Sequence, residues 1–268
     1  MPPSSRGLGH ELFKLVTPVR IRLGARHPTM FLGHAAVALA AKKAAPTTSL
    51  GTLLMAAQFI DLLWPVFLLL GLEHVRIDPG NTALTPLDFY DYPFSHSLLA
   101  VVVWGFVFGG LYFAARRHRT GAVVLGLLVV SHWVLDFLTH RPDLPLAPGS
   151  ETRVGLGLWD SVAATVIVEG LLFAGCVVLY VRTTKAIDRI GTYAFWGLAA
   201  FLAVIYSMNV FGPPPPDTGV IAFAGNASWL FVLWGYWIDR HRAVRVQALA
   251  PASHDQRTYP NASNDTSS

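Results

Sequence analysis

The sequence predicts an all-α fold, a polytopic bundle of membrane-spanning helices, and three observations support this prediction. Of the 268 residues, 53% are hydrophobic and 13% are charged, whereas a soluble domain has about 25% charged residues. Six apolar stretches are long enough to cross a bilayer, for which a helix needs about 20 residues. Basic residues gather in alternate loops between these stretches.

The apolar stretches follow one another with short polar loops between them. The six expected transmembrane helices cover residues 50–72, 96–115, 121–140, 158–181, 190–211 and 219–238. A further apolar stretch, residues 30–41, is too short to cross a bilayer alone. We expect it to form a short N-terminal membrane helix, half-inserted, or a full one if Lys42 and Lys43 extend toward the interface.

The two ends of the chain differ in composition from its apolar middle. Residues 1–29 lack the apolar segment of a signal peptide, and they form a dispensable extension if translation starts at Met30 rather than Met1. Residues 30–246 are expected to form the membrane bundle. Residues 247–268 are polar and rich in Pro, Ser and Asn, which predicts a disordered cytoplasmic tail.

The distribution of basic residues predicts the orientation of the bundle. One set of alternate loops carries Lys42, Lys43, Arg116, Arg117, Arg119, Arg182, Lys185, Arg189, Arg240, Arg242 and Arg245, and the other carries only Arg76, Arg141 and Arg153. The positive-inside rule places the first set in the cytoplasm. We therefore expect a multi-pass protein of the inner (plasma) membrane with a cytoplasmic C-terminus. Because the basic residues cluster in short loops and do not form the single stripe typical of nucleic-acid binding, we expect no nucleic-acid partner. The expected partner is the lipid bilayer.

The segment SHWVLDFLTHRPD, residues 131–143, gives the sharpest functional signal. His132, Asp136 and His140 recur at a spacing of four, which places them on one face of a helix. An imidazole and a carboxylate at this spacing can bind one divalent cation, and Zn, Mn and Fe all suit such ligands. The alternative is a hydrogen-bonded His–Asp pair within a bundle. His140 is either a further functional group or the cap of its helix.

Other ionisable side chains fall at matching depths in the predicted helices. Counted at about 1.5 Å per residue, Asp61 and His132 both lie about 16 Å from the cytoplasmic ends of their helices. Such groups are costly inside a membrane, so they are candidates for function. Asp61 is a metal ligand, a buried hydrogen-bond acceptor or part of a proton relay. Glu169, near mid-bilayer, is a general base or balances the charge of a neighbour.

Two further histidines complete the candidate set. His34 heads the short helix, and His96 precedes an expected span, where Ser95 or Ser97 could orient its ring. The acidic residues of the loops are not expected to bind a metal. We expect Asp88, Asp91, Asp143 and Asp160 to be solvated turn residues, with Asp88 and Asp91 beside Tyr90 and Tyr92 at a substrate entrance.

The order of these motifs resembles a known family. FLGHAAVALAAKK, AAQFIDLLWP, YPFSHSLL and SHWVLDFLTHRPDLPL, all within about residues 30–145, resemble the YdjM-like inner-membrane proteins, which are classed as metal-dependent hydrolases. The same order is similar, more distantly, to zinc-dependent phospholipase C, an all-helical enzyme whose metals are held by His and Asp. The resemblance implies that the metal ligands are His34, Asp61, His96, His132 and Asp136.

The residues and the resemblance together lead to one functional expectation. We expect a membrane-embedded hydrolase that uses a divalent metal, zinc before Mn or Fe, on an ester or phosphoester of a lipid or membrane-associated substrate. Glu169 or His140 would carry protons. Two alternatives remain open: a proton- or cation-coupled transporter using Asp61, Glu169 and His132, and a membrane scaffold whose His/Asp cluster is structural.

Overall fold

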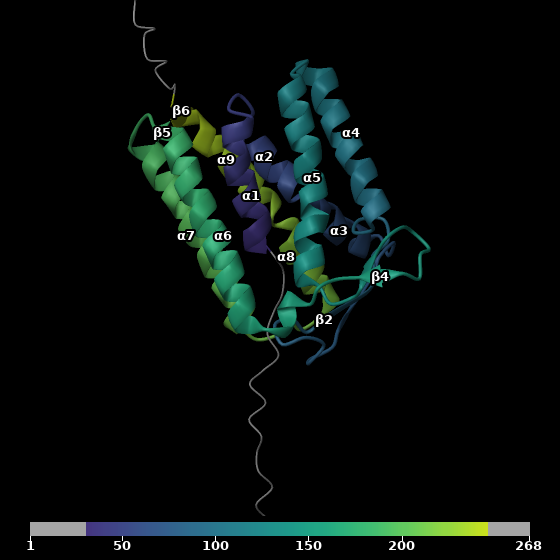
Figure 1. The fold of residues 1–268 in the computed structure, drawn as a ribbon. Coiled ribbons are helices and arrows are strands. Elements are labelled where there is room, and N and C mark those ends of the chain that lie inside the picture. The colour runs from purple at the N-terminus through teal and green to yellow at the C-terminus, as the bar shows by residue number, and fades with distance from the viewer. Residues whose placement is uncertain (1–30, 246–268) are drawn as a thin grey trace, which may run out of the picture.

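A computed structural model of the protein describes residues 31–245, and the fold of this part is mostly helical (Figure 1). Its α-helices are α1 (Phe31–Ala44), α2 (Leu50–Ala57), α3 (Phe59–Leu69), α4 (Leu98–Arg116), α5 (Arg119–Thr139), α6 (Val162–Thr183), α7 (Arg189–Phe211), α8 (Thr218–Asn226) and α9 (Trp229–Arg240). A short 3-10 helix, η1 (Leu158–Asp160), precedes α6. The predictions for residues 1–29 and 247–268 lie outside the described residues.

Five helical segments within residues 31–245 are long and apolar enough to cross a membrane, which indicates a membrane protein. They are Leu98–Arg116, Arg119–Thr139, Val162–Thr183, Arg189–Phe211 and Thr218–Arg240. The span expected over residues 50–72 is broken into two helices, because α2 and α3 meet at a bend of 56°, and it counts as a sixth span only if this bent pair crosses as one. The expected helix over residues 219–238 is likewise interrupted, between α8 and α9.

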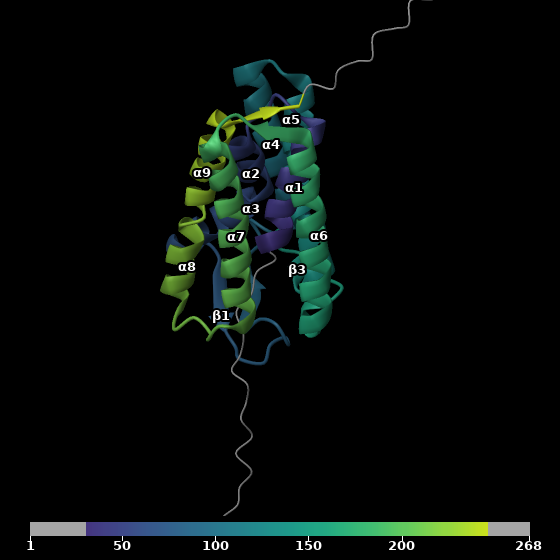
Figure 2. The same cartoon turned by 90° about the vertical axis from the view of Figure 1, so that its left-hand side faces the viewer.

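The all-α prediction also missed short strands in the loops. Three antiparallel pairs join β1 (His74–Ile77) to β2 (Leu87–Asp91), β3 (Leu144–Pro145) to β4 (Arg153–Val154), and β5 (Thr184–Ala186) to β6 (Arg242–Val244). Both views show β1–β4 at one end of the bundle (Figures 1 and 2). The opposite end holds β5, β6 and the α4–α5 turn, so the loops predicted to be cytoplasmic do share one end.

The short helix α1 lies in the middle of the bundle rather than at its edge. It packs against α2, α5, α6 and α7, and its buried face is rich in alanine, with Ala35, Ala36 and Ala38 at most 1% exposed. Small side chains let neighbouring helices approach closely. With 14 residues, α1 is about 21 Å long, too short to cross a bilayer core of about 30 Å. His34, in its first turn, therefore lies inside the protein.

Glycines allow an equally close approach between α4 and α5. A Cβ atom added at Gly105 would lie 2.9 Å from the carbonyl oxygen of Gly126, and one added at Gly126 would lie 3.0 Å from that of Gly105. The surface of α4 outside this contact exposes large apolar residues such as Phe106, 78% exposed, as expected for a surface in contact with lipid. This packing holds α5, the helix with the HxxxD motif, in its place.

We predict that Gly105→Ala destabilises the protein by about 1–3 kcal/mol, because the new methyl group meets the backbone oxygen of Gly126, which no side-chain rotation can move away. Unfolding in detergent measures the effect. Gly110→Ala is the matched control on the same helix, since an added Cβ there has no atom within 4 Å. Equal stability of the two variants would contradict the close α4–α5 packing.

Candidate metal centre

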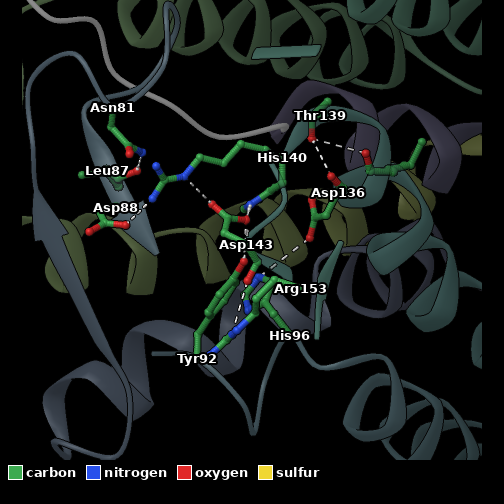
Figure 3. Close-up of polar contacts among 12 residues, drawn as sticks. Asn81, Leu87, Asp88, Tyr92, His96, Asp136, Thr139, His140, Asp143 and Arg153 are labelled. Carbon is green, nitrogen blue, oxygen red and sulfur yellow. Dashed lines mark hydrogen bonds and ion pairs between the residues drawn. The ribbon is translucent and has the colours of Figure 1, made fainter. Parts of the chain in front are cut away.

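Four of the predicted ligands converge on one point from three segments of the chain. Helix α5 supplies His132 and Asp136, α3 supplies Asp61, and the loop before α4 supplies His96. Figure 3 shows His96 and Asp136 pointing toward each other, with His140 close by. The Nε2 atoms of both histidines lie within 4 Å of an oxygen of both carboxylates, so the four side chains form one cluster.

The distances between these atoms fit the ligand shell of a single small cation. His132 Nε2 lies 3.6 Å from Asp61 Oδ1 and 3.2 Å from Asp136 Oδ2. His96 Nε2 lies 3.7 Å and 3.8 Å from the same two oxygens. Ligands about 2.0–2.2 Å from a tetrahedral zinc ion are about 3.3–3.6 Å from one another. The four printed N–O distances are close to this range, and the ligand atoms fall into two overlapping groups of three that could each hold a metal ion: Asp61, His96 and His132, and His34, His132 and Asp136.

The buried polar atoms of this cluster also lack the hydrogen bonds that an apolar site requires. His132 Nε2 and Asp136 Oδ2 are fully buried and lie 3.2 Å from each other, and neither makes a hydrogen bond of good geometry with a described residue. A buried polar atom left in this way costs about 1–3 kcal/mol, and more when it is charged. A bound cation removes this cost, so the cluster can hold a metal ion.

The bend between α2 and α3 prepares His132 for this role. Its Nδ1 lies 2.9 Å from the carbonyl oxygen of Ala57, and because a carbonyl only accepts, Nδ1 carries the proton. Nε2 is then left with a lone pair that points into the cluster. In an uninterrupted helix the Ala57 carbonyl would bind the N–H of Asp61. The bend directly after Ala57 makes this carbonyl available to His132.

A hydrogen-bonded chain orients the ring of His96 in a similar way. The Oγ of Ser95 lies 2.7 Å from His96 Nδ1 and donates to Glu73 Oε2 at 2.6 Å. Of the two serines expected to orient this ring, Ser95 does so, whereas Ser97 caps the N-terminus of α4. Glu73 was not identified from the sequence, in which the only available signal was an acidic residue directly after an apolar run.

His34 lies beside the four-atom cluster and contacts it through Asp136. Its Nε2 is 3.2 Å from Asp136 Oδ1, the oxygen that faces away from His96 and His132. Its ring stacks on that of His132, with centroids 3.7 Å apart. His34, His132 and Asp136 form a second group that could hold a metal. The structure thus brings together all five residues predicted as ligands. His34 contacts Asp136 at Oδ1, whereas His96 and His132 contact it at Oδ2.

His140 directly follows α5 and forms a second polar group with Asp143 and Tyr92, beside the metal-binding cluster. Its Nδ1 lies 2.9 Å from Asp143 Oδ1, which also accepts a hydrogen bond of 3.0 Å from the Tyr92 hydroxyl (Figure 3). Burial and the Asp143 carboxylate raise the pKa of Tyr92 well above its ordinary value, so the hydroxyl stays a neutral donor. Because the contact with Asp143 uses Nδ1, the other ring nitrogen of His140, Nε2, can exchange a proton with a reactant.

The expectation that Asp88 and Asp143 are solvated turn residues is wrong. Asp88 is 5% and Asp143 9% exposed. Asp88 is paired with Arg76 and, at 2.5 Å, with Arg141, which in turn contacts Asp143 at 3.4 Å. These charged side chains thus form a continuous network of ion pairs, which joins the site through the contact between Asp143 and His140. Each carboxylate is buried because an arginine or histidine neutralises it.

Glu169 lies on α6 and is completely buried. Its carboxylate is near the backbone N–H of Gly33, next to His34, and close enough to Asp136 to repel it electrostatically. It does not line the cavity at the metal centre. Its predicted role as a proton carrier stays a prediction, and His140 is the better-placed residue for that role.

A small cavity lies against the cluster. It offers about 10 Å³ to the centre of a water-sized sphere, which is room for about one water molecule or one ion. Its walls combine polar groups with the aromatic rings of α3, β2 and η1: His34, Asp61, Trp64, Phe89, His96, Asp136, His140 and Trp159. His34, Asp61, His96 and Asp136 therefore line the same small cavity as His140, whereas His132 does not line it.

Comparisons of the chain with known protein families, with curated proteins and with solved structures found no match. The likeness to the YdjM-like family therefore rests on the motifs alone. The site is defined by its own geometry.

We predict that the purified protein binds zinc and that Asp136→Asn weakens binding more than about 100-fold, because changes to the surroundings of a ligand alone cost about 10–100-fold. Competition with a chromogenic chelator measures the affinity. Asp78→Asn changes an exposed acid and should leave the affinity intact. Unchanged zinc binding by Asp136→Asn would exclude this cluster as the metal site.

Proposed function

We propose that the protein is a membrane-embedded, metal-dependent hydrolase of the YdjM-like kind, acting on an ester or phosphoester of a lipid or membrane-associated substrate. The observation that carries the proposal is the shared cavity. Residues able to bind a divalent metal, preferably zinc, lie there beside a histidine held by a carboxylate. A metal site and a general base side by side are the two parts that such hydrolysis requires.

Each residue has a distinct role in this proposal. Asp61, His96, His132 and Asp136 would bind the metal. His34 would form a hydrogen bond with Asp136 Oδ1 or act as a fifth ligand. When bound, the metal acts as a Lewis acid and makes water a better nucleophile. His140 accepts a proton at Nε2, and Asp143 stabilises the imidazolium that results. Trp159, with its ring centroid 4.2 Å from that of His140, helps to exclude bulk water.

We predict that His140→Gln lowers kcat about 10²–10⁴-fold, the usual contribution of a general acid–base group, without changing bound zinc. Bis(p-nitrophenyl) phosphate and vesicles of phosphatidylethanolamine and phosphatidylglycerol are suitable probes. His74→Gln alters an exposed histidine at the same end of the protein and serves as control. Equal turnover by both variants would remove His140 from the mechanism.

A structural metal site is the second candidate, and one observation favours it. Four protein side chains that could bind zinc lie in one cluster, and structural zinc sites are closed by four protein ligands. In that case zinc raises the melting temperature of the protein, and neither the phosphodiester nor the phospholipid vesicles are hydrolysed by the wild type or by any variant. Zinc-dependent hydrolysis would exclude this alternative.

We also propose that six segments cross the inner membrane, with the bent α2–α3 pair as one of them and the C-terminus in the cytoplasm. The basic residues at the β5–β6 end support this orientation. The metal centre then opens toward the periplasm, where the network of Asp88 and Arg141 lies.

Single-cysteine labelling tests the orientation in a Cys176→Ala background. With a membrane-impermeant maleimide on intact spheroplasts, Glu151→Cys in the β3–β4 loop should react. Thr120→Cys, at the start of α5, should react only after lysis. Both positions are exposed, so the reverse pattern would invert the proposed topology.

A further inference from the structure

The loop that carries His96 is built around a buried glutamate. Glu73, between α3 and β1, is completely buried and accepts three hydrogen bonds from the segment before α4. Its Oε1 accepts the backbone N–H groups of Phe94 and Ser95, each at 2.7 Å. Its Oε2 accepts the Ser95 hydroxyl at 2.6 Å. A carboxylate satisfied by three donors is fixed in position.

The direction of these hydrogen bonds determines the proton on His96. A serine hydroxyl has one hydrogen, and Ser95 gives it to Glu73. The Ser95 oxygen can then only accept along its 2.7 Å contact with His96 Nδ1, so Nδ1 must carry the ring proton. The neutral imidazole then has its lone pair on Nε2, the atom 3.7 Å from Asp61 Oδ1. That is the form that can bind a metal.

We propose that Glu73 is a positioning residue, which acts through Ser95 to hold His96 in the tautomer whose Nε2 is free to bind the metal. The inference rests on the metal site of the proposed function and adds to it the residue that prepares one ligand. His132 obtains the same tautomer from the carbonyl of Ala57. Two histidines of the cluster are thus fixed by acceptors from unrelated parts of the chain.

Glu73→Gln tests the inference because it reverses the chain of hydrogen bonds. The glutamine oxygen must face the two backbone N–H groups, since its NH₂ group would repel them. The NH₂ group then donates to Ser95, whose hydroxyl turns to donate to His96 Nδ1. The ring proton moves to Nε2 and opposes metal binding. Ser95→Ala removes the chain without reversing it, so it should have a smaller effect.

Zinc affinity and the tautomer of His96 are the two measurements. We expect Glu73→Gln to weaken zinc binding about 10–100-fold and Ser95→Ala to weaken it less. The ¹⁵N shifts of labelled histidine in the metal-free protein, assigned with His96→Asn, should show the proton moving to Nε2 only in Glu73→Gln. Asp91→Asn is the matched control. It removes one negative charge from the same hairpin, where Asp91 pairs with exposed His74, and should leave both measurements unchanged.

The outcomes separate this inference from the proposed function. Wild-type affinity in Glu73→Gln would overturn the role of Glu73 and leave the metal site standing. Equal losses in Glu73→Gln and Ser95→Ala with an unchanged tautomer would show a role in loop structure alone, and would also overturn the inference. If wild-type protein bound no zinc, the metal site would fail, and the tautomer measurement would still decide whether Glu73 sets the proton on His96.

Discussion

The carboxylate of Asp136 is the interaction on which the rest of the site depends. It is 3% exposed in an apolar bundle, where an uncompensated charge is strongly unfavourable. Three imidazole rings approach it: His34 at one oxygen, His96 and His132 at the other. Each ring comes from a different segment, so the position of α1, the loop before α4 and the face of α5 are linked through one side chain.

Interruptions in regular structure bring the other groups to this carboxylate. The bend after α2 releases the carbonyl of Ala57 toward His132 and turns Asp61, in the first turn of α3, into the cluster. The end of α5 places His140 beside Asp143 rather than one turn further along a helix. A bundle of straight helices would hold the same residues at similar depths but would not supply the acceptors that orient them.

The sequence was a good guide to the apolar helices and to the candidate ligands, because both follow from local patterns. Hydropathy and length identify a membrane helix without knowledge of its neighbours, and a spacing of four places His132 and Asp136 on one face. The bend at Gln58 and the burial of Asp88 and Asp143 were not predicted. These depend on contacts between distant residues: Arg141 with Asp88, for example, or Glu73 with Ser95. No periodicity in the chain encodes such pairs.

The short central helix has a consequence for how the protein is made. Although α1 precedes the other described helices in the chain, one of its main packing partners, α6, is synthesised more than 100 residues later. A segment of about 21 Å is a poor substrate for stable insertion by itself. The burial of α1 is therefore complete only after α6 has been synthesised. The contact between His34 and Asp136, which are 102 residues apart in the chain, likewise requires that α5 has already been made.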